Sequence, residues 1–373
     1  MTPKRRIPVY EPLLGQQERE LLDDCIRSGW ISSIGKYIPR FERQFARFCD
    51  CSHAAAVSSG TAALHLTLAA LGIGRGDEVI VPSLTFVATA NSVSYTGAKV
   101  VLVDVTEDTW TINPEQVESA ITPRTKAVIA VHLYGHPCDM RPLLAITRPK
   151  GIKVIEDAAE AHGAEYSGKR VGSLGDAGCF SFYGNKVITT GEGGMVVTND
   201  AELDSRVRFL RDHSMDAERR YFHPEIGYNY RMTNVQAAIG CAQMKRINAM
   251  VRTKRTLAQA YSERLRDIEG LLLPPEKEWA KSVYWLYTVV LERAFGISSA
   301  ELARRLASAG IDTRPVFIPM HQLPMYATRR RFPVSERLSR NGLSLPSSPS
   351  LREKDIDHIC GRIRRGKSGG MHP

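Results

Sequence analysis

A single lysine, Lys186, lies in a glycine-rich segment whose composition suits covalent chemistry. The segment covers residues 181–194, reads SFYGNKVITTGEGG, and follows a strand-like apolar run at residues 179–182. Because glycine lets the backbone turn sharply and approach a ligand, we expect this lysine to lie, poorly solvated, at the mouth of a strand. Desolvation lowers the pKa of an amine, and the neutral amine is the form that condenses with an aldehyde cofactor. The alternative is an ordinary solvated lysine in a surface loop.

Carboxylates follow another strand-like run. Residues 153–161 read KVIEDAAEA, and Glu156, Asp157 and Glu160 come after the apolar part. A carboxylate at the C-terminal end of a parallel strand points into the ligand crevice of an open α/β sheet. Pyridoxal phosphate (PLP) needs such a group, because an acid beside its ring nitrogen keeps the ring protonated. We assign this role to Asp157, whose alternative is a helix cap. Glu160 can share its face, and Glu156 is expected to be structural or solvated.

A third segment could bind a phosphate group. Residues 57–61 read VSSGT and precede a helix-forming run at residues 62–71, which places Ser59, Gly60 and Thr61 at a helix N-terminus. Free backbone N–H groups and the positive end of the helix dipole bind phosphate there, and the hydroxyl groups add donors. Plain Ser/Thr capping of the helix is the alternative.

An aromatic side chain completes the set. Phe86 lies in the loop after the strand expected at residues 78–81. Its flat ring could stack on a pyridine ring, although a place in the core is the commoner fate of phenylalanine. Each of the four signals is weak alone. Together, an amine, a carboxylate, a phosphate-binding helix and an aromatic ring at strand ends favour a PLP enzyme.

The elements that must position these residues alternate along the first half of the chain. Runs rich in Val and Ile are separated by helical stretches, and this alternation favours an α/β fold with a mostly parallel, buried sheet. The expected strands cover residues 78–81, 100–103, 127–131, 153–155, 178–182 and 195–198, and helices are expected at residues 62–71, 114–120 and 140–146.

The second half reads as a smaller α+β unit. Helices are expected at residues 234–250, 252–266, 299–309 and 353–364, strands at residues 283–291 and from Gly310, and an irregular stretch at residues 316–349. We therefore expect a large α/β domain with an N-terminal arm at residues 1–250, a small α+β domain at residues 251–365, and a disordered tail at residues 366–373.

Composition excludes several classes of protein. The formal net charge is +10 over 373 residues, but Lys and Arg are dispersed among Asp and Glu, so no nucleic-acid binding is expected. The sequence contains no apolar run long enough to predict a membrane span, and its N-terminus lacks the apolar stretch of a signal peptide. The seven Cys include no CxxC pair, which favours reduced thiols, a cytoplasmic location and no metal site.

From about residue 7 to about residue 363 the chain resembles the sugar aminotransferases of the PLP-dependent fold-type I class, which act on nucleotide-linked keto-sugars. The matching stretches are SSGTAALHL, GDEVIVPSLTF, ITPRTKAVIAVHLYG, VIEDAAEA, SFYGNKVITTGEGG and GYNYRMTNVQAAIG. The resemblance implies an aspartate-aminotransferase-like fold, PLP as cofactor, and a homodimer with shared active sites. A related dehydratase group carries His at the position of Lys186, so this lysine favours the aminotransferases.

The resemblance also implies roles at matching positions. Lys186 would hold the cofactor covalently and move protons, and Asp157 would pair with the ring nitrogen. Glu160 would lie near the ring and Phe86 would stack on it. Expected phosphate ligands are Gly60, Thr61, Ser181 and, from the other subunit, Asn229, with Ser59 added by its place before the helix; expected substrate ligands are Tyr183, Arg231, Arg314 and His321. From the residues alone, a core histidine remains open for His321 and a surface ion pair for Arg314.

The segments expected to touch the sugar, SGWISSIGKYIPRFE, SFYGNK and RPVFIPMH, are most similar to the perosamine-forming branch of this family. That resemblance implies amino transfer from L-glutamate to GDP-4-keto-6-deoxy-D-mannose. The alternatives are a 4-keto sugar on UDP or dTDP and a 3-keto sugar. Two other classes remain: a non-catalytic PLP-binding regulatory protein and an α/β enzyme without PLP. Lys186 together with Asp157 counts against the regulatory protein, because binding alone does not require both.

Overall fold

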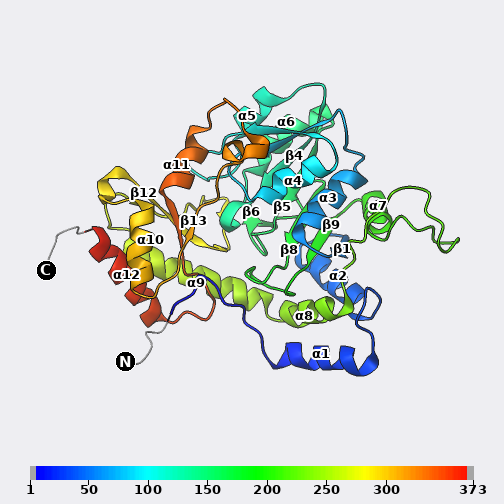
Figure 1. The fold of residues 1–373 in the computed structure, drawn as a ribbon, viewed down its shortest axis with the longest axis horizontal. Helices are drawn as coiled ribbons and strands as arrows, with labels where there is room; N and C mark the ends of the chain where they lie inside the picture. Colours follow the sequence, from blue (N-terminus) through cyan, green and yellow to red (C-terminus); the bar gives the residue numbers. More distant parts are fainter. Residues whose placement is uncertain (1–5, 368–373) are drawn as a thin grey trace.

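The computed structural model describes residues 6–367, and its main body is a seven-stranded sheet flanked by helices (Figure 1). The strand order is β1 (His53–Val57), β9 (Gly194–Thr198), β8 (Ala177–Ser181), β5 (Lys153–Asp157), β4 (Thr125–Val131), β2 (Glu78–Pro82) and β3 (Lys99–Val103). Neighbouring strands are parallel except at β9, which runs antiparallel to β1 and β8. The expected α/β class is confirmed, and the edge strand β1 is an addition to the predicted set.

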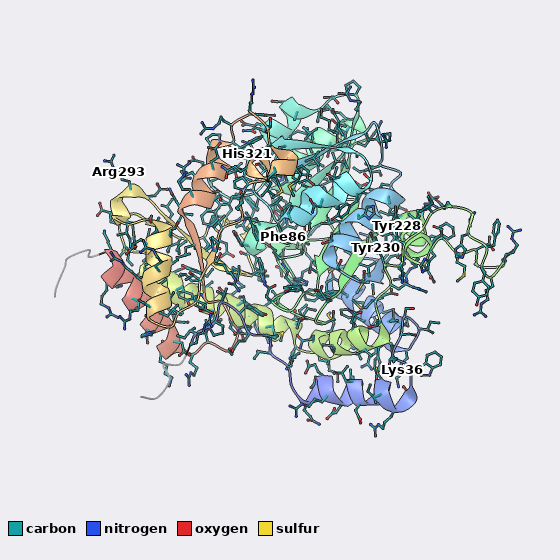
Figure 2. The ribbon with its side chains drawn as sticks, in the orientation of Figure 1. Lys36, Phe86, Tyr228, Tyr230, Arg293 and His321 are labelled. Atoms are coloured by element: carbon teal, nitrogen blue, oxygen red, sulfur yellow. The ribbon has the colours of Figure 1, made fainter. Side chains whose placement is uncertain are left out.

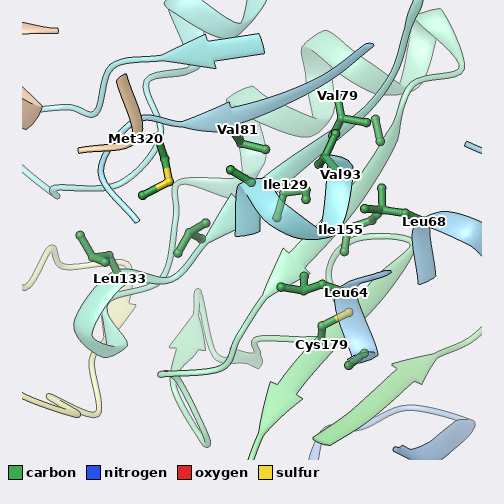
Figure 3. Packing of buried hydrophobic residues seen from close by; sticks show 14 of the residues in the cluster. Leu64, Leu68, Val79, Val81, Val93, Ile129, Leu133, Ile155, Cys179 and Met320 are labelled. Atoms are coloured by element: carbon green, nitrogen blue, oxygen red, sulfur yellow. The ribbon is translucent and has the colours of Figure 1, made fainter. Parts of the chain in front are cut away.

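Consecutive residues of β8 show how the sheet separates two cores. Cys179 packs with Leu64 and Ile155 on one face (Figure 3), whereas the next residue, Phe180, packs against Phe45 on the other. Successive side chains of a strand point to opposite faces, so a strand covered on both faces is apolar throughout. One face is covered by α3 (Gly60–Ala70), α4 (Val87–Tyr95) and α7 (Ala201–Arg211); the other is covered by α2 (Tyr37–Phe48), α5 (Pro114–Ala120), α6 (Met140–Thr147) and α8 (Asn234–Met244).

A second, antiparallel sheet lies in the C-terminal part of the chain. Its order is β10 (Leu271–Leu272), β12 (Tyr287–Leu291), β14 (Gly342–Leu345) and β13 (Arg314–Pro315). It shares a core with α9 (Ile247–Leu265), α10 (Ser299–Ser308) and α12 (Glu353–Lys367). The remaining elements are α1 (Gln16–Ser28), the small sheet of β6 (Glu165–Tyr166), β7 (Lys169–Arg170) and β11 (Ala280–Lys281), and the 3-10 turns η1 (Leu133–Gly135), η2 (Arg148–Lys150) and η3 (Arg293–Phe295).

The expectation of an irregular stretch at residues 316–349 is wrong. That stretch contains the 3-10 turns η4 (Met320–Gln322) and η5 (Pro324–Tyr326), the helix α11 (Pro333–Asn341) and the strand β14. β14 is an inner strand, paired with β12 on one side and β13 on the other. The helix expected at residues 234–250 is also interrupted, because α8 ends at Met244 and α9 begins at Ile247.

The two sheets are joined by α9 and by the N-terminal arm. α9 continues through residue 250, so the proposed domain boundary falls inside this helix and stays a prediction. In the arm, the Ile7 N–H donates to the Gly310 carbonyl (2.8 Å) and the Val9 carbonyl accepts from Ser347 N–H (2.8 Å). At the other end, α12 extends to Lys367, two residues into the expected tail, and residues 368–373 lie outside the described residues. Within residues 6–367, no helix is long and apolar enough to cross a membrane.

Candidate active site

The residues predicted to do chemistry meet in a cavity of about 370 Å³ at the carboxyl ends of β5 and β8. In an open α/β sheet this edge is where ligands bind, because the loops leaving parallel strands diverge there. The lining includes these predicted residues: Ser59, Gly60, Thr61, Phe86, Asp157, Glu160, Ser181, Tyr183 and Lys186. The four predicted segments, at residues 59–61, 86, 157–160 and 181–186, are distant in sequence but come together as one site.

The Lys186 amine is almost enclosed. Its side chain is 11% exposed, its Nζ lies 3.9 Å from Glu160 Oε1, and the Trp285 ring centre is 3.7 Å away. Burial lowers the pKa of Lys186, and the charges of Glu160 and Asp157 act in the opposite direction. The Lys186 main chain is also fixed, because its N–H donates to the Tyr183 carbonyl (2.9 Å) and its carbonyl accepts from Tyr10 Oη (2.6 Å). This geometry excludes the solvated surface lysine.

Asp157 is the last residue of β5, and its carboxylate is held on two sides. Oδ2 accepts from Thr89 Oγ1 (2.8 Å) and Oδ1 accepts from Ala159 N–H (3.2 Å). Burial raises the pKa of Asp157, and the hydrogen bond from Thr89 is the largest opposing influence. No helix begins at Asp157, because the next regular element is β6. The alternative of a helix cap is therefore excluded.

Two further acids differ in their surroundings. Glu160 Oε2 accepts from the Tyr134 N–H (2.7 Å), and burial raises the pKa of Glu160. Glu156 faces away from this site: it is fully buried and accepts from Gly172 N–H (2.7 Å), among other donors, and pairs with His132 Nε2 (2.9 Å). Since each oxygen of Glu156 is engaged, this residue holds the loop before β8 against β5, which is the structural one of the two roles left open for it.

The N-terminus of α3 approaches β8 closely. Ser59 is the N-cap, and its Oγ accepts from Ala62 N–H (3.1 Å), so capping is present. A Cβ placed on Gly60 would lie 2.7 Å from Ser181 Cβ, and one on Gly194 would lie 2.3 Å from the Ser59 carbonyl oxygen. Both glycines are therefore required for the strand ends to reach the helix. Capping engages only the Ser59 hydroxyl. The N–H groups of the first turn of α3 and the hydroxyls of Thr61 and Ser181 remain available as donors, and this set of donors fits a phosphate.

Aromatic rings line the other side of the cavity. Phe86 is the N-cap residue of α4 and is 53% exposed, which excludes a place in the core. Its ring centre lies 5.6 Å from that of Phe317, and Phe317 stacks on Tyr134 at 5.6 Å. Tyr134 in turn stacks on Trp285 at 6.2 Å. A flat ligand ring that enters the cavity would meet a surface of aromatic faces and edges.

Sequence reasoning missed part of this lining. Trp285 and Phe317 come from the C-terminal half of the chain, and Asn185 and Glu192 lie in the lysine segment itself. Nothing local in the sequence marks Trp285 or Phe317, because their place depends on how the two sheets pack. Thr89, which holds Asp157, could have been found from its position one turn into the helix that follows Phe86.

Asn229 and Arg231 are not among the residues that line the cavity, although Arg231 forms a β-bridge with Val57, two residues before Ser59. Asn229 is exposed in the segment before α8, its Oδ1 accepts from Arg231 Nη2 (3.1 Å), and Arg231 pairs with Asp212 (2.7 Å). Tyr228 and Tyr230, which flank Asn229, stack on each other with ring centres 5.1 Å apart (Figure 2). Both tyrosines are partly buried against the core beside His65, and Asn229 between them is exposed.

Arg314 and His321 are likewise not brought to the cavity lining. Arg314 is exposed on β13, at the edge of the second sheet. His321 is buried, with its Nδ1 2.7 Å from Ser83 Oγ and its ring 4.6 Å from that of Phe332. These contacts match the core histidine that the sequence left open, and the substrate-binding roles of both residues stay predictions.

A buried amine, a buried carboxylate at a strand end and a helix N-terminus in one cavity fit PLP, and this fold and site define a PLP-dependent aminotransferase. The chain belongs to the DegT/DnrJ/EryC1/StrS aminotransferase family, which matches residues 12–364. The expectations of family, cofactor and enzyme class are confirmed.

Individual relatives resemble the chain over nearly its whole length. GDP-perosamine synthase of Caulobacter vibrioides is 46% identical over 96% of this chain and 97% of its own. The crystal structure of S. venezuelae DesV with a ketimine intermediate has a TM-score of 0.89 at 38% identity and covers 95% of each chain. The PLP form of the putative sugar aminotransferase Spr1654 from Streptococcus pneumoniae has a TM-score of 0.92 at 27% identity, covering 98% of this chain and 99% of that one.

Proposed function

We propose that this enzyme transfers the amino group of L-glutamate to GDP-4-keto-6-deoxy-D-mannose, yielding GDP-perosamine and 2-oxoglutarate. In the net reaction the sugar exchanges its keto oxygen for the amino group and a hydrogen, and glutamate undergoes the reverse exchange. The observation that carries the aminotransferase chemistry is the enclosed Lys186 amine, 3.9 Å from Glu160 in the cavity that Asp157 also lines. The choice of sugar is supported by the near full-length similarity to GDP-perosamine synthase.

The proposed cofactor ligands follow from the donor set. Ser59, Gly60, Thr61 and Ser181 would hold the phosphate, because N–H groups and hydroxyls converge at the start of α3. Phe86 would cover the ring, supported by its exposed position in the lining. When bound, PLP supplies an aldehyde that condenses with amines and a ring that withdraws electrons from the carbon next to the nitrogen.

The protein's own groups would manage the protons. Lys186 would hold the cofactor covalently, and its free Nζ would accept a proton from the α-carbon of glutamate. Its lowered pKa suits this work, because an amine must be neutral to accept a proton. Asp157 would hold a proton on the cofactor's ring nitrogen, and Thr89, which donates to Oδ2, keeps the carboxylate oriented for that role. Glu160 lies close enough to Lys186 to influence which of the two holds a proton.

Discrimination among sugars would come from the polar groups of the pocket. A hydroxyl in the wrong place leaves buried donors or acceptors without partners, which costs more than the loss of an apolar contact. Tyr183, half exposed in the cavity lining, is placed to touch the sugar. We propose it as a sugar contact, whereas Arg231, Arg314 and His321 would need a movement or a second subunit to reach the cavity.

The acceptor is tested by measuring kcat/KM with glutamate on a panel of keto-sugar nucleotides and by determining the product with mass spectrometry and NMR. We expect GDP-4-keto-6-deoxy-D-mannose to exceed the UDP- and dTDP-linked 4-keto sugars by at least about tenfold, which is roughly 1.4 kcal/mol of transition-state binding. Preference for a 3-keto acceptor contradicts the regiochemistry, and preference for uridine or thymidine contradicts the nucleotide. If glutamate reacts but no sugar nucleotide is aminated, the sugar is removed from the proposal.

We further propose a homodimer in which Asn229 completes the active site of the other subunit by reaching its phosphate. Support comes from the exposure of Asn229 and its segment outside the cavity of its own chain. Exposed polar residues beside stacked aromatic rings are typical of interfaces.

Subunit mixing tests this arrangement. Homodimers of Lys186→Ala and of Asn229→Ala should each be poorly active, whereas mixed dimers should recover activity. In a mixed dimer one site carries both defects and the other carries neither, so at most about half of the wild-type activity per mixed dimer is expected. Activity is measured after mixing, and mixed dimers are counted by native mass spectrometry. Proven mixed dimers that remain inactive contradict an Asn229 that acts across the interface.

A further inference from the structure

A second lysine, Lys254 of α9, is enclosed far more completely than Lys186. It is 2% exposed, and its Nζ donates to the Trp285 carbonyl (2.8 Å) and to the Ser347 carbonyl. No carboxylate forms an ion pair with Lys254 among residues 6–367, and burial lowers its pKa to about 7. An unpaired amine in the interior is costly and is retained where an apolar side chain cannot take its place.

The carbonyl that Lys254 holds belongs to a residue of the active site. The Trp285 indole Nε1–H donates to the Asn185 carbonyl (2.7 Å), one residue before the candidate catalytic lysine. The face of the same indole lies 3.7 Å from Lys186 Nζ. Lys254 therefore fixes the main chain of a residue whose side chain both anchors the lysine segment and covers the amine.

A second path leads from Lys254 to the same segment. Its Nζ lies 5.4 Å from the ring centre of Tyr10, on the N-terminal arm. The Tyr10 hydroxyl donates to the Lys186 carbonyl (2.6 Å). The arm itself is held by the second sheet, where Ser347 N–H donates to the Val9 carbonyl (2.8 Å). The consecutive carbonyls of Asn185 and Lys186 are thus held by Trp285 and Tyr10, two of the three residues that contact the Lys254 amine.

We propose that Lys254 is a positioning residue for Lys186: by joining Trp285, Tyr10 and Ser347 at one ammonium, it holds the indole against the Lys186 amine and keeps that amine in a dry environment. Lys254 is not among the residues that line the cavity. It acts on the Lys186 segment from α9. This positioning role rests on the proposed role of Lys186 as the reactive amine.

The physical consequence of removing Lys254 has a definite sign. Without the ammonium, the Trp285 and Ser347 carbonyls lose a donor, and the indole is free to tilt from Lys186. Water then reaches the amine, so the burial that lowers the pKa of Lys186 is relieved and this pKa rises. Loss of the indole face, which favours the charged amine, acts in the opposite direction, but burial is the dominant cause of the shift in the pKa of Lys186.

The test is Lys254→Met, with Lys245→Met as a matched control that removes an exposed lysine just before α9. In cofactor-free protein, acetic anhydride labelling of Lys186 across a pH series, read by peptide mass, gives the pKa of the amine. We expect Lys254→Met to raise the labelling midpoint by at least about half a pH unit. In the loaded enzyme, the half-reaction with glutamate should slow by roughly 10- to 100-fold, the size typical of a misplaced catalytic group. Lys245→Met should change neither quantity.

A purely structural role predicts a different pattern. Lys254→Met would then lower the melting temperature but leave both the labelling midpoint and the half-reaction rate per folded molecule unchanged, and this result overturns the proposal. If Lys254→Met does not fold, Tyr10→Phe decides, because it removes only the hydroxyl that reaches the Lys186 carbonyl. An upward shift of the midpoint in Tyr10→Phe supports the proposal and an unchanged midpoint overturns it. Neither measurement uses a sugar, so failure of the proposed acceptor leaves both results interpretable.

Discussion

Replacing Lys186 by alanine is expected to slow amino transfer by at least about 1000-fold, because one side chain serves as both the covalent anchor and the base. The fold should survive, since the amine is buried without a close ion pair, its nearest carboxylate oxygen being 3.9 Å away. The measurement is 2-oxoglutarate formation from L-glutamate in a single turnover. A small primary amine added to Lys186→Ala should restore part of the rate, because it can enter the space left by the side chain and accept the proton.

The assignment of Lys186 is checked independently in the wild-type enzyme. Borohydride reduction should attach the cofactor irreversibly to the peptide that contains Lys186. Lys169→Ala, which removes an exposed lysine on β7, is the matched control and should retain full activity. Attachment of the cofactor to a peptide other than that of Lys186 would contradict the assignment, whatever the activity of the alanine variant.

The residues of the site that could be predicted from the sequence are those that lie in short, recognisable segments. Lys186, Asp157 and the start of α3 each follow a strand, and a parallel sheet brings the carboxyl ends of its strands to one edge. Local composition was therefore sufficient to place these residues together. The sequence also predicted that Lys186 would be poorly solvated, because glycines and apolar residues surround its segment.

Trp285 and Phe317 could not be found in this way. Their contact with the site depends on the packing of the second sheet against the first, across about 100 residues of chain from Lys186 to Trp285. The same is true of Lys254, which lies on a helix expected from its periodicity but gives no sign in the sequence that its amine is enclosed. A lysine in an amphipathic helix normally reaches solvent.

The errors in secondary structure have tertiary causes. β14 reads GLSL beside prolines and serines, a weak strand signal, and its pairing with β12 and β13 makes it an inner strand. The break between α8 and α9 has neither Gly nor Pro. It occurs at Arg246, whose side chain donates to the Leu13 carbonyl (2.6 Å) and to Glu18 Oε1 (2.5 Å), so contacts with the N-terminal region decide where the helix is interrupted.

Asp157→Asn should produce two opposite effects in one protein. The amide keeps the shape of the side chain but removes the charge that holds a proton on the cofactor ring, so the electron sink fails. We expect the half-reaction with glutamate to slow by at least about 1000-fold, which corresponds to roughly 4 kcal/mol of transition-state stabilisation. Thr89→Val is the matched comparison, because it removes the hydrogen bond to Oδ2 and leaves the charge. Its expected loss is smaller, about 10-fold, one hydrogen bond's contribution.

The same substitution should not harm the folded protein without cofactor. Burial raises the pKa of Asp157, so the folded state binds this proton more tightly than the unfolded chain does. The stability that this group contributes is present at low pH and falls as the pH rises from the unfolded pKa to the raised folded pKa. Above that range the buried carboxylate opposes folding, and asparagine, which carries no charge at any pH, relieves this penalty.

We therefore expect cofactor-free Asp157→Asn to melt at or above the wild-type temperature at neutral pH. The difference between the two proteins should shrink as the pH is lowered through the raised folded pKa of Asp157, and it should stop changing below about pH 4. Thermal unfolding across a pH series, in parallel with the half-reaction, measures both effects. A loss of only a few-fold in rate would make Asp157 an orienting group rather than the partner of the ring nitrogen. A lower melting temperature at every pH would show instead that the carboxylate stabilises β5 through Thr89 and Ala159, and the rate loss would then have to be corrected for the unfolded fraction.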